Sequence, residues 1–132
     1  MQSHFSFINK TRGKTPRAPF AAIKDAALGK TYDLSLALIS PSAMRKITIE
    51  HKHDDHVSNV LSFPLSKTSG EILICPSAAK PFSVEYLFIH GLLHLKGLKH
   101  GATMERNERA LLARFASYGK DRNGHRRRHL PS

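Results

Sequence analysis

Three histidines toward the C-terminal end of the chain have the spacing of a metal site. His90 and His94 are four residues apart, so on a helix their side chains project from the same face, one turn apart. Gly97 can adopt the left-handed conformation that ends a helix, which would let His100 return toward the pair. Three imidazole ligands leave one tetrahedral position of Zn²⁺ open, as catalytic zinc sites do. The sequence therefore predicts one zinc ion held by these three histidines in a metal-dependent hydrolase.

The residue after the first histidine limits the chemistry. The spacing His-x-x-x-His-x-x-Gly-x-x-His is that of the metzincin proteases, whose motif has Glu directly after the first histidine as the general base. Gly91 occupies that position here, so a protease is disfavoured. Imidazole ligands favour zinc, while nitrogen ligands alone leave nickel, cobalt and iron open.

The charge of the chain indicates a polyanionic partner. The 132 residues include 21 Lys and Arg against 10 Asp and Glu, a formal net charge of +11 with the histidines neutral. This excess favours nucleic acid, although charge alone does not choose between RNA and DNA. The three consecutive arginines at 126–128 can grip phosphates as planar forks or belong to a solvated tail, and both interpretations stay open.

Size, cysteine content and hydropathy indicate a single domain in a reducing compartment. Cys75 is the only cysteine, which excludes an intramolecular disulfide, and its apolar surroundings predict a buried side chain. Residues 1–14 lack the apolar core of a signal peptide, and no stretch approaches the roughly 18 apolar residues of a membrane span. We expect a cytoplasmic protein that uses no membrane, with a domain over residues 1–119 and a basic tail over residues 120–132.

The elements that must position the histidines follow from apolar periodicity and helix-end signals. Strands are expected over residues 3–8, 32–39, 59–63 and 70–75, and the last two are close enough to form a hairpin. Helices are expected over residues 20–28, 41–49, 82–96 and 103–118. The β-branched run Ile47-Thr48-Ile49 leaves a strand as the alternative to the second helix. The predicted fold class is α/β (α+β), a small mixed sheet packed with helices in a single zinc-binding domain.

A second cluster of histidines, within residues 51–56, also has a metal-binding composition. It lies in a polar stretch without apolar periodicity, so we expect a solvated loop there.

Three segments in this order resemble the signatures of one protein family. They are Ser-Asn-Val-Leu-Ser-Phe-Pro at 58–64, Gly-Glu-Ile-Leu-Ile-Cys at 70–75, and the histidine motif at 90–100. Together they are similar to the motifs of the YbeY family of bacterial rRNA maturation factors and single-strand-specific endoribonucleases. Gly91, directly after the first histidine, distinguishes this family from the metzincins.

The resemblance implies a function and a catalytic set. It implies a zinc-dependent endoribonuclease that acts in 16S rRNA 3′-end maturation and ribosome quality control, with rRNA, the small ribosomal subunit and an assembly GTPase as partners. Lys52 stands where the family has a functional Arg, so the predicted catalytic residues are Lys52, His90, His94 and His100. The nucleophile stays open among water activated at the metal, the RNA 2′-OH and an outside group.

Two departures from the family pattern support an alternative function. The family has Asp just before its last histidine, whereas this chain has Lys99, which cannot accept a hydrogen bond and whose charge opposes a nearby cation. Lys52 keeps the charge of an Arg without its bidentate fork. The alternative is a non-catalytic, zinc-stabilised rRNA-binding factor in ribosome assembly.

Overall fold

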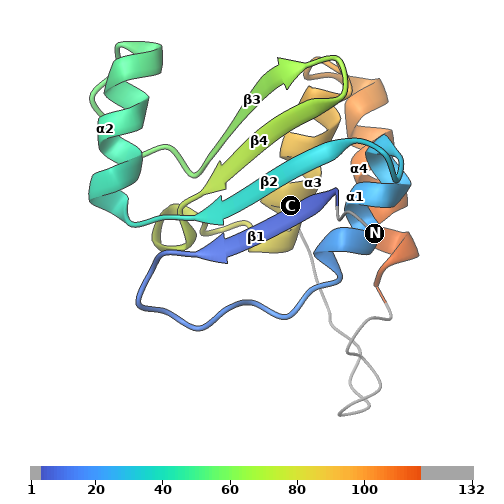
Figure 1. Cartoon of the computed structure of the whole chain (residues 1–132), viewed down its shortest axis with the longest axis horizontal. Coiled ribbons are helices and arrows are strands. Elements are labelled where there is room, and N and C mark those ends of the chain that lie inside the picture. The colour runs from blue at the N-terminus through green and yellow to red at the C-terminus, as the bar shows by residue number, and fades with distance from the viewer. Residues whose placement is uncertain (1–3, 117–132) are drawn as a thin grey trace.

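The computed structural model describes residues 4–116, which form four strands, four α-helices and one short 3-10 helix (Figure 1). In chain order these are β1 (Phe5–Asn9), α1 (Phe20–Leu28), β2 (Asp33–Leu38), α2 (Pro41–Lys52), β3 (Val60–Ser66), β4 (Ser69–Ile74), η1 (Pro76–Ala78), α3 (Val84–Leu95) and α4 (Ala102–Arg114). Among these residues, no helix is long and apolar enough to cross a bilayer.

The strands form one mixed sheet in the order β1-β2-β4-β3. β1, β2 and β4 are parallel, and β3 pairs antiparallel with β4 through the predicted hairpin. Pro64 lies in β3, where an edge strand tolerates a residue that cannot donate to the ladder. The predicted fold class, a small mixed sheet packed with helices, is confirmed.

Helices α1, α3 and α4 cover one face of the sheet, and α2 lies at one end of the sheet (Figure 1). Met44 of α2 packs into a smaller core on the opposite face. Side chains alternate along a strand, so Leu36 and Ile72 face the three helices while Ala37 and Leu73 face the smaller core. α3 lies at the centre of the larger core, with Phe88 and Leu92 fully buried. The helix that carries two of the three histidines is therefore fixed by burial.

The predicted elements are confirmed with shifted ends. The second helix forms and the strand alternative at 47–49 is wrong, because Met44 and Thr48 lie one turn apart on the buried face of α2. α2 continues three residues beyond the predicted end, to Lys52, and His53 then takes a left-handed conformation and caps it. α4 ends at Arg114, before the predicted end at Tyr118; Tyr118 and the predicted tail lie outside the described residues.

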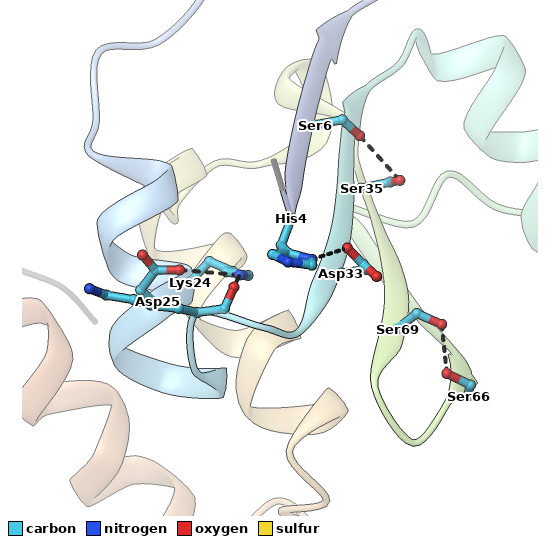
Figure 2. A network of polar contacts seen from close by, with 9 residues as sticks. His4, Ser6, Lys24, Asp25, Asp33, Ser35, Ser66 and Ser69 are labelled. Carbon is cyan, nitrogen blue, oxygen red and sulfur yellow. Dashed lines mark hydrogen bonds and ion pairs between the residues drawn. The ribbon is translucent and has the colours of Figure 1, made fainter. Parts of the chain in front are cut away.

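Polar side chains form contacts between neighbouring strands and at helix α1 (Figure 2). Ser6 of β1 and Ser35 of β2 are register partners and are joined by a hydrogen bond, as cross-strand pairs often are. Lys24 of α1 is 1% exposed, and its ammonium donates to the carboxylate of Asp25 and to the carbonyl oxygen of Lys30, both at 3.1 Å. These partners account for the burial of this cation and fix the turn between α1 and β2.

Candidate metal centre

The C-terminal end of α3 has the geometry that its sequence predicts. Gly97 has φ 104°, its amide donates to the His94 carbonyl, and the amide of Leu98 donates to the Leu93 carbonyl. This pair of bonds is the Schellman motif, in which a left-handed residue satisfies the last carbonyls of a helix. The chain therefore turns back at once after Leu95, and this brings His100 beside the last turn of α3.

The three predicted histidines form one cluster. Ring centroids lie 4.6 Å apart for His90 and His94, 4.7 Å for His94 and His100, and 5.1 Å for His90 and His100. One nitrogen from each ring lies within 4.8 Å of the others. Two of the rings are half-buried and His100 is exposed, so one side of the cluster is open to solvent.

Hydrogen bonds fix which nitrogens face the centre of the cluster. His94 Nδ1 lies 3.1 Å from the carbonyl oxygen of Leu98, which can only accept, so Nδ1 carries the proton. His90 Nδ1 lies 2.6 Å from a carboxylate oxygen of Glu108 and donates to it in the same way. Both rings therefore turn Nε2 toward the centre, and the two Nε2 atoms are 3.2 Å apart.

This arrangement fits a metal ion. Nitrogens bound to one tetrahedral zinc at about 2.0–2.1 Å lie about 3.3 Å apart, close to the separation of the two Nε2 atoms. With both Nδ1 protons in use, neither Nε2 of two neutral rings can donate to the other, so their approach needs a cation or an extra proton between them. Burial, and then the neighbouring His90, lowers the pKa of His94, which favours the neutral ring that a metal requires.

A buried carboxylate that the sequence analysis missed stands behind the cluster. Glu108 of α4 is 5% exposed; one oxygen accepts from His90 and the other accepts from the Tyr86 hydroxyl at 3.0 Å. The spacing of the histidines gives no hint of it, because 18 residues separate it from His90. One signal was available: Glu108 falls four residues after Met104 and three before Leu111, on the apolar stripe of α4.

Lys52, the fourth predicted catalytic residue, is not part of this cluster. It is exposed at the end of α2 and lines a cavity of about 260 Å³ with the short segment His56–Val60 and with Ala78. Figure 1 places α2 at one end of the sheet and the turn between α3 and α4 near the other. The catalytic role of Lys52 stays a prediction.

The second histidine cluster is exposed throughout, as expected for a solvated segment. Its first two residues, His51 and Lys52, belong to α2 rather than to a loop. Asp55 accepts a bidentate contact from Arg45, and that hydrogen bond holds the pKa of the carboxyl below its usual range. Within residues 4–116, the grouping of possible metal ligands occurs only at His90, His94 and His100.

A mixed sheet packed with helices, with three converging imidazoles at a helix end, has the donor set of a histidine metal site. Comparison with known families then narrows the class: the model of the family described as endoribonuclease YbeY matches residues 8–116. The chain belongs to the YbeY endoribonuclease family.

Individual curated relatives carry the same family name. The chain is 38% identical over 82 residues to endoribonuclease YbeY of Rubrobacter xylanophilus, covering 59% of this chain and 60% of that protein. It is 33% identical over 86 residues to that of Finegoldia magna, covering 52% and 56%. The chain thus spans less than two thirds of the length of these two curated relatives. A longer match, to that of Renibacterium salmoninarum, has 29% identity over 128 residues and covers 76% and 82%.

A solved structure supports the fold. The solution structure of TM1509 from Thermotoga maritima superposes with a TM-score of 0.60 at 20% identity, covering 91% of this chain and 93% of that one. At this identity the likeness establishes the architecture alone.

Proposed function

We propose that this protein is a zinc-dependent, single-strand-specific endoribonuclease that acts in the cytoplasm on the 3′ end of 16S rRNA during maturation and ribosome quality control. The observation that carries the proposal is the pair of Nε2 atoms of His90 and His94, 3.2 Å apart with both Nδ1 atoms already bonded elsewhere, within the motif of an endoribonuclease family. His100 completes the donor set from the turn after α3.

Individual residues have different roles at the proposed metal site. When bound, a zinc ion with three imidazole ligands supplies a Lewis acid for a phosphate oxygen and for the attacking nucleophile. The Leu98 carbonyl holds His94 through Nδ1 and leaves Nε2 for coordination. The exposed side of the cluster at His100 leaves room for an RNA strand to approach. Position 91 is a glycine, so the Glu that serves proteases as general base is absent. In this proposal the bond that breaks is a phosphodiester of RNA.

An exposed basic loop supports RNA as the substrate. Residues 10–19, between β1 and α1, contain four exposed cations and no acid: Lys10, Arg12, Lys14 and Arg17. The loop is held by Asn9, whose side chain accepts from the Thr11 amide and donates to the Gly13 carbonyl. An ordered cluster of cations of this kind contacts phosphates without reading sequence.

The cavity beside Lys52 supports a second contact with the strand. Its lining combines the cation of Lys52 with the polar side chains of His56 and Asn59. We expect Lys52→Arg to raise cleavage by restoring a bidentate fork, and Lys52→Met to lower it. Lys46→Arg, an exposed change on the same helix, is the control. Equal rates for all four proteins would remove Lys52 from the catalytic set.

The central test uses His94→Ala. The purified wild type should contain about one equivalent of zinc and cleave a fluorescent single-stranded RNA, while His94→Ala should lose both. His4→Ala, which removes a histidine ring bonded to Asp33 at the rim of the sheet, is the control and should keep both. RNA cleavage that survives in metal-free His94→Ala would come from a contaminating nuclease and would end the enzymatic proposal.

The alternative of a non-catalytic assembly factor is favoured by one observation, the exposed Lys99 beside the third histidine. It predicts zinc-dependent folding and RNA binding with a steep salt dependence, but no cleavage at any metal load. Binding of rRNA or of the small subunit, without turnover in the assay above, would select it. An assembly GTPase is a further partner that either function accommodates.

A further inference from the structure

We propose that Glu108 is a positioning residue of the metal centre: its carboxylate holds His90 through Nδ1, and the Tyr86 hydroxyl in turn holds the carboxylate. The inference rests on the proposed metal site and adds to it a support that comes from a different helix, α4.

Burial and contact geometry give Glu108 this role. A carboxylate that is 5% exposed is costly unless both oxygens are bonded, and here each oxygen has one partner. The contact to His90 is short, 2.6 Å, as expected for a charge-assisted hydrogen bond. The result is a chain of contacts from Tyr86 through Glu108 to His90, ending at the Nε2 that faces His94.

The same geometry excludes Glu108 as the missing general base. Its two oxygens are occupied by His90 and Tyr86, and the side chain is closed off from solvent and from any substrate. It would act on a bound metal only through His90, whose Nδ1 it holds. Carboxylates in this position fix the tautomer and orientation of a ligand histidine and raise its basicity, and their loss typically weakens metal binding by about 10- to 100-fold.

Helix α4 supplies the carboxylate that contacts both Tyr86 and His90. Tyr86 and His90 are one turn apart on α3 and their rings stack at 6.1 Å, so one carboxylate from α4 can reach both. Met104, four residues earlier, is buried in the larger core, and α4 packs on α3. The packing of α4 on α3 is thereby linked to the affinity of the site for metal.

The test compares four variants of the full chain after removal of metal. Zn²⁺ affinity is measured by competition with a chelator, and Co²⁺ is added to record its ligand-field absorption. We expect Glu108→Ala to bind Zn²⁺ about 10- to 100-fold more weakly than wild type and to alter the Co²⁺ spectrum. Glu108→Gln keeps an acceptor for His90 Nδ1 and should recover part of the loss, and Tyr86→Phe should lose about two- to tenfold. Glu105→Gln, the same change at an exposed site on α4, should behave as wild type.

A second readout does not depend on metal. In the metal-free wild type, ¹⁵N-NMR of the imidazoles should show the His90 proton on Nδ1, and Glu108→Ala should redistribute it. If Glu108→Ala does not fold, the inference is decided by Glu108→Gln and Tyr86→Phe against Glu105→Gln. Unchanged Zn²⁺ affinity and Co²⁺ spectra in these variants, or a wild-type His90 protonated on Nε2, overturn it. A wild type that binds no metal but keeps the Nδ1 proton would instead overturn the proposed function.

Discussion

A methyl group added to Gly91 would lie 3.1 Å from Cδ1 of Ile72, so α3 packs on β4 closely enough that even a methyl group there crowds the isoleucine. The glycine that separates this chain from the protease motif is therefore a packing residue. An acid placed there would enter the core beside a fully buried isoleucine rather than serve the histidines.

The contact predicts an energetic coupling between Gly91 and Ile72. Gly91→Ala should destabilise the protein by about 1 kcal/mol, because overpacking costs about 1–3 kcal/mol and the helix propensity of Ala offsets about 1. Ile72→Val removes the nearest carbon, so the double variant should be more stable than the sum of the single effects by about 0.5 kcal/mol or more. Urea unfolding measures this, with Ile74→Val in place of Ile72→Val as the control. Additive effects in both pairs would show that the helix shifts to accommodate the methyl group.

The glycine at the end of α3 should matter for metal as well as for stability. Gly97→Ala forces an alanine into a conformation with φ 104°, at a cost of about 1–2 kcal/mol, and displaces the Leu98 carbonyl that orients His94. Gly29→Ala creates the same kind of strain at the end of α1, where φ is 96° and a Cβ has open space. Both variants should lose stability in thermal unfolding, and only Gly97→Ala should bind Zn²⁺ several-fold more weakly. Equal affinities would mean that the Schellman turn does not position the ligand.

The Tyr86 hydroxyl should ionise at a higher pH than an ordinary tyrosine. Burial, and then its hydrogen bond to Glu108, raises the pKa of Tyr86 from 10.0 to about 12. Since the folded protein favours the protonated phenol, the stability that Tyr86 contributes is fully present below pH 10 and is lost as pH rises toward 12. The difference in tyrosinate absorbance between wild type and Tyr86→Phe should be small at pH 10.5. Glu108→Gln should lower the pKa only in part, because burial is the larger cause. A full phenolate signal at pH 10.5 in folded wild type contradicts the contact.

The sequence predicted the parts of the site that depend on local geometry. His90 and His94 share a helix face, and Gly97 ends that helix, because both features are set by residues three to four positions apart. Glu108 was not predicted, because its hydrogen bond with His90 depends on how α4 packs on α3, and no local sequence pattern encodes that packing.

The second helix and Gly91 also depend on contacts with other elements. The β-branched residues at 47–49 kept a strand as the alternative to the predicted second helix, and the buried pair Met44 and Thr48 shows that the helix forms and which face it buries. The role of Gly91 could be suspected from its place in an apolar face, but its neighbour Ile72 lies on β4, 19 positions earlier in the chain. The sequence predicted the elements and the hairpin of β3 and β4, whereas contacts between elements far apart in the chain were beyond it.

Lys99 offers a direct test of how electrostatics tune the site. It is exposed and adjacent to His100, so its positive charge opposes any divalent cation at the cluster. Lys99→Asp reverses that charge and should tighten Zn²⁺ binding by about threefold to tenfold at low ionic strength, with a smaller gain near 0.15 M salt because exposed charges are screened. The control is Lys80→Asp, which makes the same charge change before the first turn of α3; the 12 residues of that helix span about 18 Å. Chelator competition at two salt concentrations measures both. If both variants gain the same Zn²⁺ affinity, the effect is one of net charge. A gain confined to Lys99→Asp, together with faster RNA cleavage, would identify Lys99 as the residue that limits Zn²⁺ binding and cleavage in this protein.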